Sequence, residues 1–205
     1  ALEYGILDPN KTIRCKGHKH PYELYGVKYH CWKKEGHGYM KLRNAIKQSC
    51  DIYFYEMARL LGVDKLSVIA KRYGLGTNVL GEVYNDEKSG LVPNTKWKRR
   101  ALEQSWYLGE TVINGIGQGY IQTTPLQLCL MTAQIANGGH KIYPTLLIDN
   151  NDKKDKFVSL VNNPENIKFV QEAMFSSTNE IRGTSYRSRI EDSRYQFAGK
   201  TGTAQ

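Results

Sequence analysis

Two segments of the sequence are apolar on nearly every helical face, and they constrain the fold more than any other feature. The first is IYFYEMARLLG over residues 52–62, and the second is LQLCLMTAQIANGG over residues 126–139. A helix that is apolar all round has to be buried by other parts of the protein. In a chain of 205 residues this requires one sizeable core or two smaller ones. No apolar run approaches the roughly 18 residues of a membrane-spanning helix.

Start and stop signals place further helices around these segments. Residues 41–48 have a helical pattern and lead into Ser-Cys-Asp at 49–51. Asp64 is a good N-cap for the helix expected after it, because its carboxylate can accept hydrogen bonds from first-turn amides. Thr124 before Pro125, and Asn163 before Pro164, each combine a capping side chain with proline at the first helical position. We therefore expect residues 41–138 to form a mainly helical subdomain.

The remaining stretches are irregular or strand-like. Residues 11–40 and 74–123 lack a sustained helical or strand period, and we expect mostly loops there. KIYPTLLI (141–148) and QFAGKTGTAQ (196–205) have the pattern of strands, so residues 139–205 are expected to begin a sheet subdomain. Helices that come first and strands that come late predict an α+β fold, not an alternating parallel sheet.

The chain is basic, with 29 Lys plus Arg against 20 Asp plus Glu and a formal net charge of +9. Such a balance is compatible with nucleic acid, an anionic membrane surface or an acidic polymer as partner. The basic residues lie in short scattered groups, such as KWKRR at 96–100, and no nucleic-acid-binding motif accompanies them. The pattern favours a solvated basic surface over a nucleic-acid site.

Lys200, Thr201 and Gly202 form a candidate site for a small carboxylate, together with Thr203. An ammonium group and two hydroxyls could hold the anion, and the glycines would let a substrate backbone come close. By itself the triplet is short enough to arise by chance. On its own, the triplet is better explained as a strand end with a surface lysine.

Ser49 and Asp51 form a second candidate, at the junction between two helical stretches. There the Ser49 hydroxyl could pass a proton, and the Asp51 carboxylate could orient a lysine or an amide. On its own the pair is better explained as caps of the following helix.

Taken together, these motifs resemble a known family. Ser-x-x-Lys, Ser-Asp-Asn and Lys-Thr-Gly are the signature of penicillin-interacting serine enzymes, and two related elements occur here in that order. The strings QSCDIYFYEMARLLGVDKL, IGQGY…TTPLQL and AGKTGTAQ resemble the transpeptidase domain of class B penicillin-binding proteins. The SCD form points to the penicillin-binding protein 2 group of the rod-elongation machinery. The resemblance covers nearly the whole of 1–205 and implies the penicillin-binding, serine β-lactamase-like α+β fold.

The resemblance also implies an activity. Such proteins cross-link peptidoglycan stem peptides through a serine acyl-enzyme at D-Ala-D-Ala, and penicillins acylate the same serine. By position, Ser49 would be the proton-shuttling serine, with Asp51 the third member of its motif. Lys200 would organise the proton network and the substrate carboxylate. Thr201, Gly202 and Thr203 would line the carboxylate site, and the Thr203 N–H would supply half of an oxyanion hole.

One departure from the family pattern is clear: no serine in this chain is followed three residues later by lysine. The resemblance implies that the nucleophile lies upstream of Ala1 and that further strands follow the Lys-Thr-Gly segment. We therefore expect this chain to be a part of the domain that does not acylate by itself.

Three cysteines and a histidine form a candidate metal site: Cys15, Cys31, His37 and Cys50. Their spacing matches no common zinc-finger pattern, so spacing alone is weak evidence. The loop region around them has no apolar reason to be ordered, and a structural Cys3His zinc would order it. Relatives of the penicillin-binding protein 2 group carry zinc around this loop, which implies the same ligands here.

Other interpretations of these residues stay open. Cys15 and Cys31 could form a disulfide, because the implied compartment is oxidising. His18, His20 or His30 could replace His37 as a ligand, and Cys50 could be an inert thiol. Cys129, within the second apolar helix, is expected to be a core thiol.

Several functional hypotheses follow. The leading one is a peptidoglycan D,D-transpeptidase of cell elongation, without a catalytic cofactor. The others are a β-lactam sensor or serine β-lactamase of the same fold, and a non-catalytic, zinc-ordered binding module with a basic face. The resemblance further implies the periplasmic side of the bacterial inner membrane, with the anchor outside this chain. Its implied partners are stem peptides, β-lactams, a glycan polymerase and a periplasmic scaffold.

Overall fold

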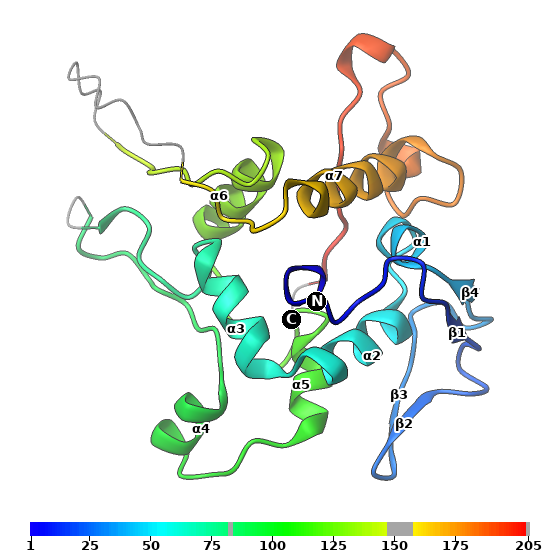
Figure 1. Ribbon diagram of the computed structural model, residues 1–205, viewed down its shortest axis with the longest axis horizontal. Helices are drawn as coiled ribbons and strands as arrows, with labels where there is room; N and C mark the ends of the chain where they lie inside the picture. The colour runs from blue at the N-terminus through cyan, green and yellow to red at the C-terminus, as the bar shows by residue number, and fades with distance from the viewer. Residues whose placement is uncertain (82–83, 147–157, 204–205) are drawn as a thin grey trace. The chain divides into compact units, whose positions relative to one another are not determined.

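The computed structural model describes residues 1–81, 84–146 and 158–203. These residues divide into two compact units, whose elements are labelled in Figure 1. Unit 1 comprises Ala1–Gly62, Tyr107–Gly119 and Lys168–Gln205, and unit 2 comprises Val63–Trp106 and Tyr120–Ile167. None of the described helices combines the length and the apolar character that crossing a bilayer requires.

Unit 1 is built from helices and two small antiparallel strand pairs. Its helices are α1 (Leu42–Lys47), α2 (Asp51–Leu61), α5 (Leu108–Asn114) and α7 (Pro164–Asn179) from residue 168 onward. Its strands are β1 (Ile13–Cys15), β2 (Tyr22–Leu24), β3 (Val27–Tyr29) and β4 (Gly38–Met40), and its 3-10 turns are η1 (Leu2–Tyr4), η3 (Tyr186–Ser188) and η4 (Ser193–Tyr195). Strand β1 pairs with β4, and β2 pairs with β3. This α+β arrangement agrees with the predicted fold class.

Helix α2 lies at the centre of the unit 1 core, as its apolar sequence predicts. It packs against α1, β1 and α5. Gly115, just after α5, is the point of closest approach, because an added Cβ would lie 2.3 Å from the Ala58 Cβ. Fourteen buried residues make up the core: Leu7, Cys15, Cys31, Met40, Leu42, Ala45, Ile46, Cys50, Ile52, Tyr53, Tyr55, Met57, Val112 and Ala173.

The region 11–40, expected to be irregular, contains all four strands. Tyr25 and Gly26 link β2 to β3, with φ values of 50° and 79°, as a two-residue hairpin turn requires. The rings of Tyr22, Tyr29 and Tyr55 contact one another, which attaches this hairpin to α2. Most of the region is loop, as expected, and the sequence did not reveal these strands because three residues are too few to show a period.

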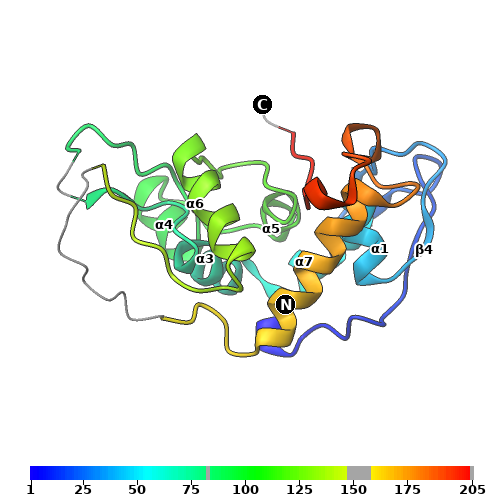
Figure 2. The ribbon, with the colours of Figure 1, turned by 90° about the horizontal axis from the view of Figure 1, so that it is seen from above.

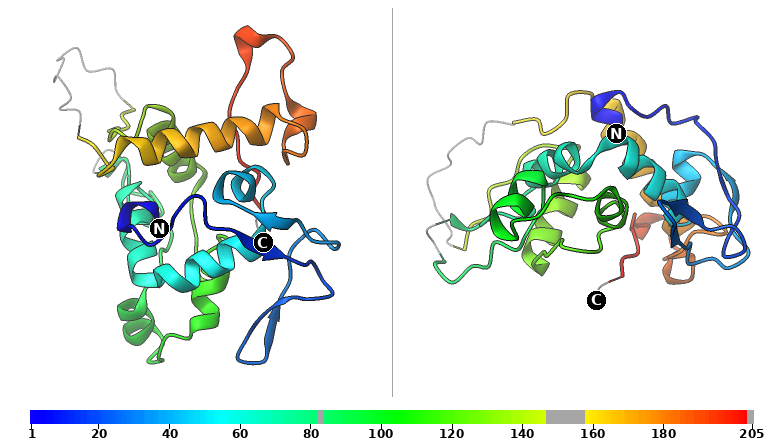
Figure 3. Two further views of the ribbon diagram at one scale, coloured as in Figure 1. Left: turned by 45° about the vertical axis from the view of Figure 1, so that its right-hand side comes forward. Right: turned by 90° about the horizontal axis from the view of Figure 1, so that it is seen from below.

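Helix α7 ends next to α1 within unit 1 (Figure 2). Glu180, just beyond α7, accepts hydrogen bonds from Arg43 and Lys47 of α1. The segment that carries η3 and η4 then extends from the end of α7 before it returns to the unit (Figure 3).

Unit 2 contains α3 (Val63–Arg72), α4 (Thr95–Ala101), α6 (Pro125–Ala136) and the first turn of α7. Helix α6 starts as predicted: the Thr124 side chain and Gln127 form a capping box, and Pro125 is at the first position. Gln127 has no exposed surface. Its Nε2 donates to the carbonyl oxygens of Thr77 and Ser89, each at 2.8 Å. A buried amide therefore joins two loops to α6.

Several local expectations were wrong. Residues 141–146 and 196–203 form no strand; 147–148 and 204–205 lie outside the described residues. Pro144 removes one ladder donor. Isolated backbone hydrogen bonds, Lys141 N–H to the Val158 carbonyl and Gly199 N–H to the Met174 carbonyl, do not build a ladder along these stretches. The described residues of 74–123 are mostly loops, as expected, although α4 and α5 also lie there. Asp64 lies inside α3 and accepts from Thr95, so it is no N-cap. Cys129 is exposed and is no core thiol.

We predict that Gln127→Met destabilises the protein by about 2–5 kcal/mol, because two buried carbonyl groups lose their donors. Urea unfolding followed by circular dichroism would measure this change. Gln122→Met is the matched control, because the Gln122 side chain is exposed. Equal unfolding midpoints for the two variants would contradict the role given to Gln127.

We also predict a pH-dependent effect of Glu180→Gln. Hydrogen bonds from Arg43 and then Lys47 lower the pKa of Glu180 to about 2. A carboxyl group with a depressed pKa stabilises the fold at pH values above its unfolded-state pKa near 4.5. This stabilisation is lost as the pH falls towards 2. The Glu180 side chain is 38% exposed, so the variant should lose at most about 1 kcal/mol at pH 7.

The difference between Glu180→Gln and the unsubstituted protein should vanish near pH 2. Glu191→Gln is the control, because that carboxylate pairs with Arg189 but is 81% exposed. A Glu180→Gln effect of the same size at pH 7 and pH 2 would rule out the ionic explanation.

Candidate functional site

The site is organised around the break between α1 and α2. The Ser49 N–H donates to the Ile46 carbonyl and the Cys50 N–H donates to the Ala45 carbonyl, at 3.3 Å and 3.0 Å. This is the Schellman pattern of a helix end, whose left-handed position is usually glycine. Ser49 occupies that position with φ of 52°. A non-glycine residue there costs about 1–3 kcal/mol and often marks a functional site.

The Ser49 hydroxyl lies within a group of polar side chains. Lys200 Nζ donates to Ser49 Oγ at 2.6 Å. Thr201 Oγ1 is 3.0 Å from Ser49 Oγ, and Thr184 Oγ1 is 3.2 Å from it. Partial desolvation lowers the pKa of Lys200, and the nearby Asp51 charge opposes this shift. These contacts unite the two motifs that are 151 residues apart in the sequence.

The Lys-Thr-Gly segment is held from both sides. Near its start, Gly199 N–H donates to the Met174 carbonyl at 3.2 Å. Near its end, Gln118 Nε2 donates to the Thr203 carbonyl at 2.8 Å. Gly202 has open space around its α-carbon, and Thr203 is exposed. The segment is therefore fixed at both ends while its central residues face solvent.

Trp32 connects this group to the preceding loop. Its backbone N–H donates to the Asp51 carboxylate at 2.8 Å, and its indole N–H donates to the Ser49 carbonyl at the same distance. Burial raises the pKa of Asp51, while the Trp32 N–H opposes that shift. Asp51 thus orients the backbone after Cys31, and contacts Lys200 only through its charge.

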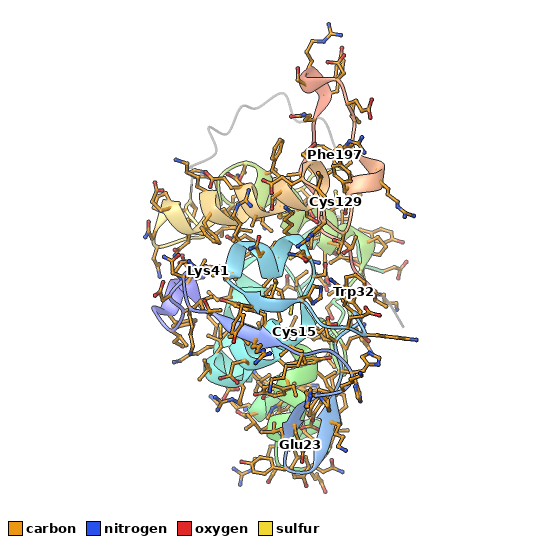
Figure 4. All side chains as sticks on the ribbon, turned by 90° about the vertical axis from the view of Figure 1, so that its right-hand side faces the viewer. Cys15, Glu23, Trp32, Lys41, Cys129 and Phe197 are labelled. Atoms are coloured by element: carbon orange, nitrogen blue, oxygen red, sulfur yellow. The ribbon has the colours of Figure 1, made fainter. Side chains whose placement is uncertain are left out.

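Cys15, Cys31, His37 and Cys50 come together on the other side of the same turn. Their ligand atoms all lie within 4.8 Å of one another, in an arrangement that could hold a metal ion. His37 Nδ1 is 3.7 Å from Cys15 Sγ and 3.4 Å from Cys31 Sγ. The three cysteines are buried and free, so the structure has no Cys15–Cys31 disulfide. Figure 4 labels Cys15 and Trp32 on this part of unit 1, with Glu23 on the projecting hairpin.

The close packing of these side chains shifts the pKa values of Cys15 and His37. Hydrogen bonds from Cys31 and then Cys50 lower the pKa of the Cys15 thiol. Burial lowers the pKa of His37, but hydrogen bonds with Cys15 and Cys31 outweigh it and raise the value to about 9. A thiolate beside a protonated imidazole is the arrangement in which a metal ion can replace the shared proton.

Two glycines let the loop fold tightly around the cluster. A Cβ at Gly17 would lie 2.1 Å from the Lys34 carbonyl oxygen, and one at Gly36 would lie 2.5 Å from the Cys15 carbonyl oxygen. Both have positive φ, at 72° and 82°. Backbone therefore packs directly on backbone here. His18 Nε2 contacts the Cys31 carbonyl at 2.8 Å and is not part of the cluster.

The structure brings Ser49, Lys200 and Thr201 into contact, and it gathers Cys15, Cys31, His37 and Cys50 in a separate cluster. Asp51 approaches the first group through Trp32, while Gly202 and Thr203 continue the exposed segment. Sequence reasoning missed three others: Thr184, Trp32 and Gln118. Thr184 follows Gly183 in a stretch without a period. Trp32 and Gln118 lie within the CWKKEGH and IGQGY strings, which were singled out without a role for either side chain.

Comparison with known proteins agrees with this geometry. Residues 1–205 match the penicillin binding protein transpeptidase domain. The chain is 36% identical to the peptidoglycan D,D-transpeptidase MrdA of Acinetobacter baumannii, over 100% of this chain and 31% of that protein. It is 30% identical to MrdA of Escherichia coli K12, over 100% of this chain and 33% of that protein.

Solved structures give the same result. The fold matches penicillin-binding protein 2 of Pseudomonas aeruginosa with a TM-score of 0.87 and 38% identity, over 100% of this chain and 47% of that one. It matches penicillin-binding protein 2 of Helicobacter pylori, solved in complex with MreC, with a TM-score of 0.84 and 32% identity, over 100% and 39%. The chain spans about a third of the length of the curated relatives. The predicted resemblance is confirmed: the chain belongs to the penicillin-binding protein transpeptidase family.

Proposed function

We propose that this chain supplies part of the active site of a penicillin-binding protein 2-type D,D-transpeptidase, which cross-links peptidoglycan during cell elongation. The observation that carries this proposal is the contact of Ser49 Oγ with Lys200 Nζ at 2.6 Å and with Thr201 Oγ1 at 3.0 Å. Ser49 is held there by a strained left-handed turn. Backbone strain of this kind persists where the surrounding structure holds the residue in place, and it is common at active sites.

Each residue has a proposed role. Lys200 donates to Ser49 and holds its oxygen in place, so that the Ser49 hydroxyl can relay a proton during acyl transfer. Thr201 and Thr203 hydrogen-bond the carboxylate of the stem peptide, and the open space at Gly202 lets that peptide approach. The Thr203 N–H stabilises the developing oxyanion. Asp51 acts indirectly, through the Trp32 backbone that it orients.

The acylated serine is proposed to belong to the full-length protein, because no serine of this chain precedes lysine at the family spacing. Attack of its oxygen on the D-Ala-D-Ala carbonyl forms the ester, and D-alanine leaves with a proton. An amine of a neighbouring stem peptide then takes the acyl group and frees the serine. No cofactor takes part in these steps.

We further propose that the cluster of Cys15, Cys31, His37 and Cys50 binds a structural zinc ion. Tetrahedral zinc, with bonds of about 2.3 Å to sulfur and 2.0 Å to nitrogen, implies sulfur-to-nitrogen distances of about 3.5 Å. The observed distances of 3.7 Å and 3.4 Å support this fit. All four ligand positions are protein groups, so the ion would stabilise the fold and take no part in the reaction.

Location and partners follow from the same family. We propose that the full-length protein works on the periplasmic side of the inner membrane, where its substrate is assembled. One similar protein was solved with MreC, and another, with a TM-score of 0.75 and 33% identity, in a peptidoglycan synthase complex that couples polymerisation and crosslinking. These neighbours support a periplasmic scaffold and a glycan polymerase as partners.

Lys200→Ala in the full-length protein should lower the rate of labelling by a fluorescent penicillin by at least about 100-fold, because the proton network loses its cation. Labelling reactions quenched at a series of times would give the rate, and peptide mapping would locate the adduct. Lys71→Ala, an exposed lysine of unit 2, should label normally.

The same measurement separates the competing functions. A stable adduct supports the transpeptidase, whereas rapid release of hydrolysed penicillin would identify a serine β-lactamase. A properly folded protein that takes no label would favour the zinc-ordered binding module.

Cys31→Ser should remove zinc from the purified full-length protein and lower its melting temperature, because structural zinc contributes directly to folding. Elemental analysis should find about one zinc per unsubstituted protein. Cys129→Ser, at an exposed cysteine, should keep both properties. Less than half an equivalent in the unsubstituted protein, with a Cys15–Cys31 disulfide by mass spectrometry, would refute the zinc site.

A further inference from the structure

Thr184 is placed more rigidly than its position in an irregular segment suggests. Its backbone N–H donates to the Lys47 carbonyl at the end of α1, at 3.1 Å. The next N–H, of Ser185, donates to the Ser177 carbonyl of α7, also at 3.1 Å. Gly183 makes this turn possible, because a Cβ there would lie 2.1 Å from the same Ser177 oxygen. Two helices therefore fix the position of the Thr184 side chain.

The Thr184 hydroxyl contacts three others. Its Oγ1 is 3.2 Å from Ser49 Oγ, 3.1 Å from Thr201 Oγ1 and 3.2 Å from Ser177 Oγ. Ser177 has no exposed surface. A buried hydroxyl needs a hydrogen-bond partner, and Thr184 provides one. Thr184 therefore links the interior of unit 1 to the exposed group around Ser49.

The donors available in this group favour one arrangement of its protons. An ammonium has only donors and a carbonyl only accepts, whereas each hydroxyl donates once and can accept twice. Lys200 Nζ donates to Ser49 Oγ, so the Ser49 proton points elsewhere. The Thr201 hydroxyl donates to Thr184 Oγ1, and the Thr184 hydroxyl is directed at the Lys47 carbonyl, 3.5 Å away. Thr201 Oγ1 accepts a long hydrogen bond from Lys200 Nζ at 3.5 Å, and its second lone pair can accept the Ser49 proton at 3.0 Å.

Resting on the proposed function, we infer that Thr184 is a positioning residue of the transpeptidase reaction, which sets the direction of the Ser49 hydroxyl by accepting the proton of Thr201. With Thr184 in place, the Ser49 oxygen presents a lone pair to Lys200 and its hydrogen to Thr201. Without the Thr184 oxygen, the Thr201 proton turns towards Ser49 and competes with Lys200 for the same lone pairs. The Ser49 hydroxyl then loses the single orientation that a proton relay needs.

The test compares Thr184→Val, which keeps the shape and removes the hydroxyl, with Thr184→Ser, which keeps the hydroxyl. In the full-length protein, Thr184→Val should lower the first-order acylation rate by a penicillin about tenfold or more, with little change in the binding constant. Thr184→Ser should stay within about threefold of the unsubstituted protein. Thr132→Val is the control, because the exposed Thr132 hydroxyl donates to the Leu128 carbonyl of its own helix.

A double-mutant cycle shows whether Thr184 acts through Ser49. In the Ser49→Ala background, Thr184→Val should cause little further loss, since the hydroxyl that it orients is already gone. Equal acylation by Thr184→Val and the unsubstituted protein would overturn the inference. So would a change confined to binding, equal losses for Val and Ser, or full additivity with Ser49→Ala. If the unsubstituted, folded protein takes no penicillin, the proposed function itself has failed, which is a separate result.

Discussion

The left-handed backbone of Ser49 is the constraint on which both parts of the site depend. A Schellman helix end normally carries glycine at this position, and serine accepts a conformational penalty of about 1–3 kcal/mol there. The turn sends successive side chains in different directions. The Ser49 hydroxyl accepts a hydrogen bond from Lys200, and Cys50 belongs to the cluster of three cysteines and His37. The Asp51 carboxylate accepts a hydrogen bond from the Trp32 backbone N–H. The strained backbone of Ser49 therefore sets the directions of three consecutive side chains.

The contacts that hold this turn come from segments distant in sequence. Trp32 approaches from the loop before α1 and binds the Ser49 carbonyl, while Thr184 approaches from beyond α7 and binds the hydroxyl. Neither contact is apolar. Directional hydrogen bonds suit this place because they fix an orientation, whereas apolar packing would fix only a position. Buried polar groups of the same kind organise unit 2, where Gln127 joins two loops to α6.

The sequence predicted those features that depend on composition and local signals. The apolar run of α2 predicted a buried helix, and the Thr124-Pro125 pair predicted the start of α6. The motif residues were found from their resemblance to a family, and the structure places them together. The cysteine spacing alone could not decide between a metal site and a disulfide, because spacing carries no information on which sulfur atoms meet in space.

Other features could not be read from the sequence for physical reasons. The strands β1–β4 have three residues each, which is too short for a period of two to emerge. Asp64 fits an N-cap, but tertiary hydrogen bonds with Thr95 outweigh that local preference. The role proposed for Thr184 rests on a contact with Ser49, which is 135 residues away in the sequence. No pattern within Arg-Gly-Thr-Ser predicts that contact.

The close approach at Gly17 and Gly36 has a consequence for how this loop can change. Around the cluster the main chain alone determines the spacing, since neither position has room for a side chain. Lys16 directly precedes Gly17, Lys34 and Glu35 directly precede Gly36, and all three side chains are exposed. In this loop the interior geometry and the surface charge are therefore independent of each other. Its interior geometry is set by backbone packing at the two glycines, so the surface charge beside this turn can be changed without altering the cluster.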